Sequence, residues 1–191
     1  MADRLARVSA VCVVAQLRAD AGPVGVTAID KRPVAGAVRV GPYGLRADVQ
    51  ADRRHHGGLD KAVYVYGQED ADFWAAELGR ELPPGWFGEN LRVEGVDVRG
   101  VAAGERWIVG DADARQRGAA LVLEATGPRR PCATFARWVG GAQAQGWVRR
   151  FSEAGRYGAY FRVLAPGEVR EGDAVRRVPA PAGSPTLASL F

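Results

Sequence analysis

Lysine is almost absent from this chain of 191 residues, which has Lys31 and Lys61 against 24 arginines. Asparagine occurs once, as Asn90, and histidine only as the adjacent pair His55 and His56. A compact ammonium and a planar guanidinium are not interchangeable at a tight site. Where a composition avoids a residue type this strongly, each remaining copy is a candidate for a position whose chemistry requires it. All five residues fall in three short segments with loop character.

Cysteine and long apolar runs are scarce as well. Cys12 and Cys132 are the two cysteines, too few for a disulfide framework and compatible with a reducing compartment. No apolar run approaches the ~18 residues of a membrane-spanning helix. The charged stretch 1–7 lacks the apolar core of a secretory signal. We therefore expect a cytoplasmic protein without a membrane partner.

The charge balance is basic, with a formal net charge of +4 and a pI near 9.4. Nucleic acid is the usual partner of a basic protein, but the arginines here are dispersed through strands and loops. No basic run exceeds two residues, and no basic amphipathic helix is present. This pattern does not predict nucleic-acid binding, and it favours a local site for a small molecule that carries a phosphate.

The segment 126–135 is the most informative part of the chain. It follows the apolar run 119–125, which predicts a buried strand. Its prolines make the following loop stiff, and Cys132 lies two residues after the pair Arg129 and Arg130. Nearby positive charge favours thiolate, the form that attacks electrophiles or binds soft metals. Cys132 is therefore either a reactive or metal-binding residue or a small apolar residue at the edge of the core.

Three other loops carry candidate residues. The segment 52–61 surrounds a glycine pair, which permits close backbone approach to an anion, although a solvated hairpin loop is the alternative. Adjacent histidines are a weak metal motif because they have no useful chelate spacing. Lys31 follows a predicted strand at 24–29 and is either solvated or directed into a cleft. Glu89 and Asn90 either pair with a heterocycle or form a capped turn.

Many short strands separated by Gly/Pro turns predict a mainly β fold with helical insertions (α+β), a barrel or sandwich. The segment 62–66 alternates like a half-buried strand, and 68–82 is the clearest helix because acidic residues start it and Pro83 ends it. At this length one domain is expected, covering 1–178, with a loose or weakly docked tail at 179–191.

Taken together, the segments resemble a MOSC domain, the module found at the C-terminus of molybdenum-cofactor sulfurases and in stand-alone bacterial proteins. The resemblance covers about residues 24–178 and is greatest to the stand-alone members. One departure is Ala47-Asp48, where the family has Gly-Asp. The matching pieces, in order, are Lys31-Arg-Pro-Val34, His56-Gly-Gly58 with Asp60-Lys-Ala-Val-Tyr64, Phe87-Gly-Glu-Asn-Leu91, Gly110-Asp111 and Pro128-Arg-Arg-Pro-Cys132.

The resemblance implies a MOSC-type β-barrel whose motif loops surround one pocket, with Cys132 as the functional cysteine. Three activities follow from it. In the first, Cys132 ligates molybdenum in a bound molybdenum cofactor (molybdopterin), and the protein reduces N-hydroxylated bases or amines. In the second, Cys132 carries a persulfide that delivers sulfur to a metal centre. In the third, the domain binds or escorts the cofactor without catalysis.

Partners and further site residues follow from the same resemblance. The partners would be a small-molecule cofactor and substrate, with an electron-donor protein or a cysteine desulfurase. Pyridoxal phosphate is not expected, because the sulfurase domain that uses it is missing. The expected cofactor-binding residues are Lys31, Arg53, Arg54, His56, Gly57, Gly58, Lys61, Phe87, Gly88, Glu89, Asn90, Arg129 and Arg130.

Overall fold

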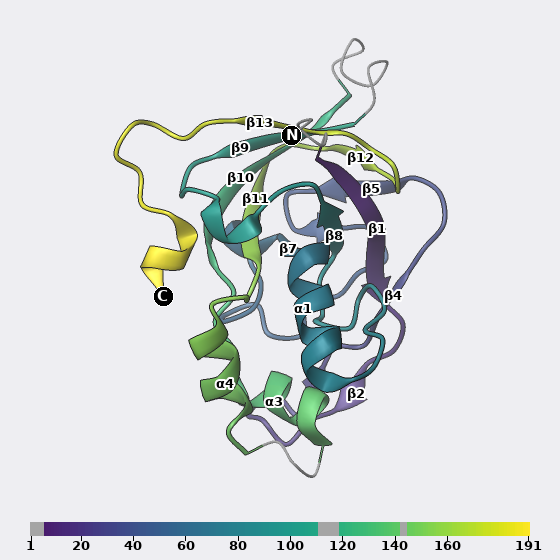
Figure 1. Cartoon of the computed structure of the whole chain (residues 1–191). Coiled ribbons are helices and arrows are strands. Elements are labelled where there is room, and N and C mark those ends of the chain that lie inside the picture. Colours follow the sequence, from purple (N-terminus) through teal and green to yellow (C-terminus); the bar gives the residue numbers. More distant parts are fainter. Residues whose placement is uncertain (1–5, 111–118, 142–144) are drawn as a thin grey trace.

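A computed structural model describes residues 6–110, 119–141 and 145–191. Its main element is an eight-stranded, strongly curved sheet (Figure 1). All pairs in it are antiparallel except the parallel pair of the fifth and sixth strands. In spatial order the strands are β13 (Val175–Val178), β9 (Arg106–Val109), β10 (Leu121–Pro128), β11 (Ala159–Ala165), β7 (Val63–Gly67), β8 (Leu91–Glu94), β1 (Arg7–Val14) and β4 (Lys31–Pro33).

The sheet curls toward a barrel without closing by a full ladder. Its two edge strands are β13 and β4. The start of β1 nevertheless approaches the start of β13 through an isolated bridge between Arg7 and Ala174. The Val8 N–H donates to the carbonyl of Asp173 at 2.9 Å. The mainly β class with helical insertions predicted from the sequence is confirmed, as a curved open sheet.

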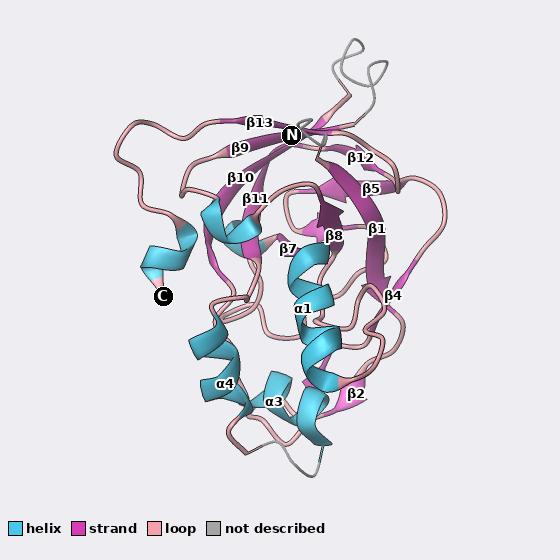
Figure 2. Ribbon diagram, in the orientation of Figure 1, coloured by secondary structure: helices cyan, strands magenta, loops and turns pink. Residues whose placement is uncertain are grey.

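Smaller elements surround this sheet (Figure 2). Two smaller sheets contain the strands β12 (Gly167–Val169), β5 (Val38–Gly41) and β6 (Gly44–Leu45), and the hairpin of β2 (Arg18–Ala19) and β3 (Val26–Thr27). The α-helices are α1 (Gln68–Leu78), α3 (Ala133–Gly140) and α4 (Trp147–Ala154), and the 3₁₀ turns are η1 (Leu59–Lys61), η2 (Val98–Gly100) and η4 (Leu187–Leu190). In the view of Figure 1, α3 and α4 lie together at one end of the molecule.

Strand β7 separates two apolar clusters. Val63 and Val65 point into the cluster enclosed by the curved sheet. Tyr64 and Tyr66, on the other face, belong to an aromatic cluster that α1, α3 and α4 cover with Trp74, Phe135 and Phe151. All five residues of β7 are buried, so the prediction of a half-buried strand was wrong. The alternation reflects two different apolar environments, because the helices cover the face that was expected to meet solvent.

Helix α1 ends earlier than the sequence pattern predicted. Its last residue is Leu78, and Gly79 follows in the left-handed conformation with φ 61°. Glycine adopts this conformation without steric cost, which makes it the usual residue just past a helix end. Leu82 is still buried in the aromatic cluster, although it lies beyond the helix.

The C-terminal segment 179–191 packs against the domain rather than lying loose. Leu187 is buried, its N–H donates to the carbonyl of Val101 at 2.8 Å, and the ring of Phe191 stacks on Tyr157. Of the two alternatives left by the composition, a loose or a docked tail, the contacts favour docking, because one buried leucine and one terminal aromatic anchor an otherwise polar, proline-rich stretch. Across the described ranges, no helix combines the length and the apolar character needed to cross a bilayer.

Candidate functional site

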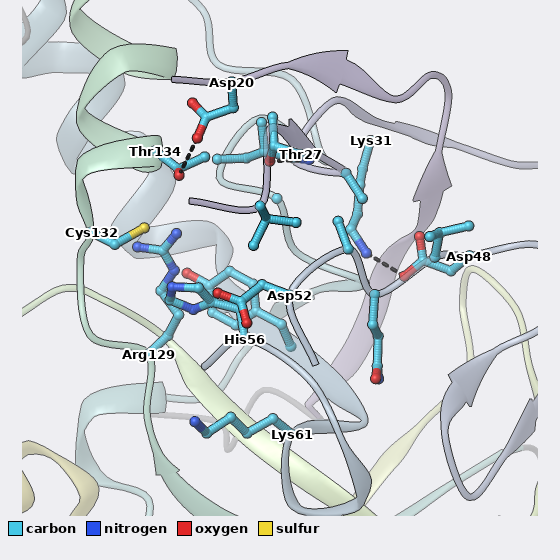
Figure 3. A pocket seen from close by; sticks show the side chains of 18 of the residues that line it. Asp20, Thr27, Lys31, Asp48, Asp52, His56, Lys61, Arg129, Cys132 and Thr134 are labelled. Carbon is cyan, nitrogen blue, oxygen red and sulfur yellow. Dashed lines mark hydrogen bonds and ion pairs between the residues drawn. The ribbon is translucent and has the colours of Figure 1, made fainter. Parts of the chain in front are cut away.

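Cys132 lies where strand β10 has ended and helix α3 begins. It is the N-terminal cap residue of α3, with extended backbone, and its side chain is partly buried. Figure 3 shows its sulfur at one side of a cavity, close to Arg129 and His56. The stiff loop predicted at 126–132 thus presents the thiol at a helix N-terminus, where the helix dipole favours a negative charge.

The surroundings of Cys132 favour the thiolate. Burial on its own raises the pKa of this thiol, but a hydrogen bond from His56, the charge of Arg129 and the N–H of Phe135 outweigh it and lower the pKa to about 6. The contrast is Cys12 in β1, which is fully buried and whose pKa burial raises to about 12. Cys132 is therefore the cysteine that is ionised near neutral pH, whereas Cys12 fills the core.

Arg129 is a buried cation without a carboxylate partner among the described residues. Its guanidinium lies 4.7 Å from the ring centroid of Phe135 and 5.9 Å from that of Tyr64. It also donates to the carbonyl of Arg130 at 3.3 Å. A buried charge is costly unless it is paired. Since Arg129 lines the cavity, a bound anion is the partner that this arrangement accommodates.

We call the cavity that Cys132 and Arg129 line the inner cavity. Its opposite side is formed by a polar network around Asp48 (Figure 3). Asp48 accepts from Lys31, from the side-chain amide of Asn90 at 2.7 Å and from the N–H of Val14 at 2.8 Å. The preceding residue, Ala47, has φ 70° and is the non-glycine residue with positive φ in the described chain. The departure from Gly-Asp noted in the sequence therefore lies at a position that favours glycine.

A hairpin covers the inner cavity and is attached to α3. Asp20, between β2 and β3, accepts from Arg137 at 2.9 and 2.7 Å and from the Thr134 hydroxyl at 2.9 Å. Hydrogen bonding by Arg137 lowers the pKa of Asp20 to about 2, against the opposing effect of burial. Residues 22–24 and 26–29 line the cavity. One wall of the cavity is thus held by an ion pair to the helix that begins at Cys132.

A second, outer cavity of about 890 Å³ adjoins the inner one, whose volume is about 150 Å³. Ligand pockets usually measure about 300–1,000 Å³. Cys132, His56, Lys61 and Tyr160 line both cavities. Arg54, Arg130 and Arg137 line the outer one. The thiol is therefore accessible from both spaces.

The structure brings most of the predicted site residues to these cavities. Lys31, Phe87, Gly88, Asn90 and Arg129 line the inner cavity, Arg54 and Arg130 the outer one, and His56, Lys61 and Cys132 both.

The other predicted site residues lie elsewhere. Arg53 stacks over Tyr43 at 5.8 Å and lines a neighbouring cavity. The Gly58 N–H donates to the side chain of Gln50 at 2.8 Å, so it is not available to an anion. Gly57 is buried against the same side chain.

Glu89 has a structural role in this arrangement. It is fully buried, pairs with Arg92, and accepts from the N–H groups of Gly85 at 2.8 Å and Phe87 at 3.0 Å. Gly85, with φ 90°, lies so close to Lys31 that an added Cβ would be 2.4 Å from its carbonyl oxygen. Glu89 thus holds the 85–90 loop against β4 and does not face the cavities. Asp111, of the predicted Gly110-Asp111 motif, lies outside the described residues.

Sequence reasoning missed Asp48, Tyr160 and Asp20. The Tyr160 hydroxyl lies 3.0 Å from Nδ1 of His56, and burial raises its pKa to about 12. The sequence contains a signal for Asp48, because this residue follows the alanine that stands where the family has glycine. Asp20 and Tyr160 had none, since their partners lie more than 100 residues away in the chain.

No group of three or more His, Cys, Asp or Glu side chains gathers as a metal site within the described ranges. A metal held here by Cys132 would therefore come with other ligands, as it does in a metal cofactor.

These features define the class of protein: a curved β domain with a thiolate between two adjoining cavities and, beside it, a buried arginine for which the described residues offer no carboxylate partner. Residues 52–176 match the MOSC domain, and the chain belongs to this family. The resemblance drawn from the short motifs is confirmed.

Named relatives support this assignment. YflK of Bacillus subtilis is 37% identical over 146 residues, covering 76% of this chain and 61% of YflK. YiiM of Escherichia coli is 29% identical over 147 residues, covering 75% of this chain and 60% of YiiM. The chain therefore spans about three fifths of the length of these relatives. A protein named reductase from Gibberella moniliformis is 29% identical over 158 residues, with 81% of this chain and 26% of the reductase covered.

The fold has a solved counterpart. The crystal structure of YiiM from Geobacillus stearothermophilus superposes with a TM-score of 0.74 and 26% identity, covering 97% of this chain and 81% of that one.

Proposed function

We propose that this protein binds the molybdenum cofactor, with Cys132 as the ligand of the metal, and reduces N-hydroxylated bases or amines. The observation that carries the proposal is the thiolate of Cys132, with a pKa lowered to about 6, between two connected cavities beside Arg129. Soft thiolate is a good ligand for such a metal. Membership of the MOSC family and a relative named reductase support it.

The residues present fit such a cofactor. Arg129 is a buried cation that lacks a carboxylate partner in the described part of the chain, so it suits the cofactor's phosphate. Asn90 and Asp48 line the inner cavity and are held by hydrogen bonds to each other and to neighbouring groups, so they form a fixed polar wall for the edge of a pterin. When bound, the cofactor would supply a metal that accepts and gives up electron pairs.

The overall reaction fixes what the protein must provide. Reduction of R–NHOH to R–NH₂ breaks the N–O bond, consumes two electrons and two protons, and releases water. The electrons come from a donor protein, which is the partner we propose, and we place the reaction in the cytoplasm. His56, hydrogen-bonded to Tyr160 at 3.0 Å, holds Cys132 in place. The apolar hairpin residues around Val24 and Val26 reduce the access of water to the inner cavity.

The test is the molybdenum and pterin content of protein purified from a host that makes the cofactor, beside Cys132→Ser and Cys12→Ser. We expect near-stoichiometric metal in the parent and in Cys12→Ser, little metal in Cys132→Ser, and reduction of a hydroxylated base only by the metal-containing proteins. Full activity of Cys132→Ser would refute the proposed ligand.

A persulfide carrier is the second candidate, favoured by the access to Cys132 from the outer cavity. In that case a cysteine desulfurase would transfer sulfane sulfur to the Cys132 thiolate to give a persulfide. The signature is an added sulfur on Cys132 by mass spectrometry, released by cyanide, in protein that contains no molybdenum. If metal-free protein stays unmodified under these conditions, the carrier function is excluded.

A further inference from the structure

The outer cavity carries cations for which the described residues offer no carboxylate partner. Arg54 forms no ion pair in the described part of the chain, and neither do Lys61 and Arg130. The ammonium of Lys61 donates to the carbonyl of His55 at 2.6 Å, and Arg130 donates to that of Leu190 at 2.9 Å. These neutral partners leave the positive charges uncompensated.

The acidic groups near this cavity are already engaged. Asp52, the carboxylate in its described lining, accepts from the N–H and the ring of His55 at 3.0 Å. Asp20 neutralises Arg137 through two hydrogen bonds. The outer cavity therefore has a net positive lining that attracts an anion.

This anion site is separate from Arg129. Arg129 lines the inner cavity, whereas Arg54 and Arg130 line only the outer one. Cys132 lies on the boundary. A molecule in the outer cavity can therefore direct one end to the sulfur and present its other end to Arg54 and Arg130.

The outer cavity also has apolar lining residues. They are Pro23, Val24, Pro128, Pro131 and the ring of Tyr160. Aromatic and proline surfaces of this kind accept a planar heterocycle. One cavity thus contains a thiol, apolar surface and cations.

We propose that the outer cavity selects substrates in which the N-hydroxylated base is part of a nucleotide, with Arg54 and Arg130 binding the phosphate. The reduction of such a nucleotide rests on the proposed reductase function, whereas the binding of its phosphate does not. The phosphate is unchanged in the reaction, where only the N–O bond breaks. The alternative ligand of Arg54 and Arg130 is the phosphate of the cofactor itself.

Binding is tested without turnover. Calorimetric titration of the cofactor-loaded protein with AMP, adenosine and inorganic phosphate compares the parent with Arg54→Gln, Arg130→Gln, the double variant and Arg176→Gln. Arg176 is exposed on β13 and lines neither cavity, so it is the matched control. A charged hydrogen bond contributes enough that AMP should bind about tenfold or more tightly than adenosine. The double variant should remove this difference and leave adenosine binding unchanged. Equal affinity of the parent for AMP and adenosine would overturn the proposal.

Two further measurements separate the possible failures. If the double variant loses molybdenum and pterin while its melting temperature is unchanged, the two arginines bind the cofactor and the nucleotide site is wrong. The ratio kcat/KM is then compared for the hydroxylated base, its nucleoside and its monophosphate. Turnover at the same kcat/KM for all three would overturn the nucleotide preference and leave the reductase standing. A preference for AMP in binding without turnover of any substrate would refute the reductase and support the phosphate site.

Discussion

His56 and Tyr160 form a hydrogen-bonded pair next to Cys132, with 3.0 Å between Nδ1 of His56 and the Tyr160 hydroxyl oxygen. Burial raises the pKa of Tyr160 to about 12, so its hydroxyl keeps its proton and can donate it to Nδ1. His56 also forms a hydrogen bond with Cys132, so the phenol of Tyr160 can act on the sulfur through the imidazole.

The first prediction concerns the reactivity of Cys132 in cofactor-free protein. Its rate of alkylation by iodoacetamide should rise with pH around a midpoint of about 6, because the thiolate is the reacting form. His56→Ala should move the midpoint up by about 1–2 pH units, since removal of one hydrogen bond to the thiolate is worth roughly that much. Mass spectrometry of the labelled cysteine gives the rate directly.

Two internal controls accompany this experiment. Cys12 should stay unlabelled in the folded protein, because it is fully buried and its pKa is raised to about 12. Tyr160→Phe should move the midpoint less than His56→Ala, because the phenol acts on the sulfur only through the imidazole. A midpoint unchanged in His56→Ala would show that His56 does not stabilise the thiolate.

The same pKa predicts a pH dependence of stability. The folded-state pKa of about 6 lies below the ordinary value of 9.0, so the unfolded chain holds the thiol proton more tightly. The resulting stabilisation is complete above pH 9 and is lost as the pH falls through 6. The free energy of unfolding of the parent minus that of Cys132→Ser should therefore increase between pH 6 and 9, as measured by urea denaturation. A difference that is constant over this range would contradict the lowered pKa.

The sequence predicted the local features of the site better than its long-range ones. The strand predicted at 119–125 and the loop that carries Cys132 could be predicted because apolar runs, prolines and glycines act on their immediate neighbours. For Glu89 the sequence left a heterocycle contact and a capped turn open, and the two loop N–H groups that it accepts from agree with the capped turn. Asp20, which pairs with Arg137 from 117 residues away, could not be predicted by any local rule.

The backbone at Ala47 yields a stabilising substitution. Its φ of 70° costs an L-residue about 1 kcal/mol, and glycine removes this strain. Ala47→Gly should therefore raise the free energy of unfolding by about 0.5–1 kcal/mol, less the added chain entropy of glycine. Ala37→Gly is the matched control, since Ala37 is also exposed in a loop but does not have positive φ, and it should destabilise. If Ala47→Gly destabilises as much as Ala37→Gly does, the left-handed conformation is not strained.

The pair of Glu89 and Arg92 should behave as structure and not as ligand. Both side chains are fully buried, and removing one partner of such a pair costs about 3–5 kcal/mol because the other charge is left uncompensated. Glu89→Gln and Arg92→Met should each lower the free energy of unfolding by an amount in this range, and the double variant by less than their sum. Denaturant unfolding measures all three. Loss of pterin in Glu89→Gln at unchanged stability would instead restore Glu89 as a cofactor ligand.

The ion pair between Asp20 and Arg137 should control how firmly the hairpin at 18–27 is attached to α3. The two hydrogen bonds between these side chains predict a favourable coupling energy in a double-mutant cycle of Asp20→Asn and Arg137→Gln. The pKa of Asp20, lowered to about 2, means that this stabilisation is present above the ordinary carboxyl pKa and is lost only as the pH falls toward 2. At pH 7, amide hydrogens of residues 18–27 should exchange faster in Asp20→Asn than in the parent, whereas Asp97→Asn, an exposed acid paired with Arg99, should leave them unchanged. Equal exchange in Asp20→Asn and the parent would mean that apolar packing alone holds the hairpin over the cavity.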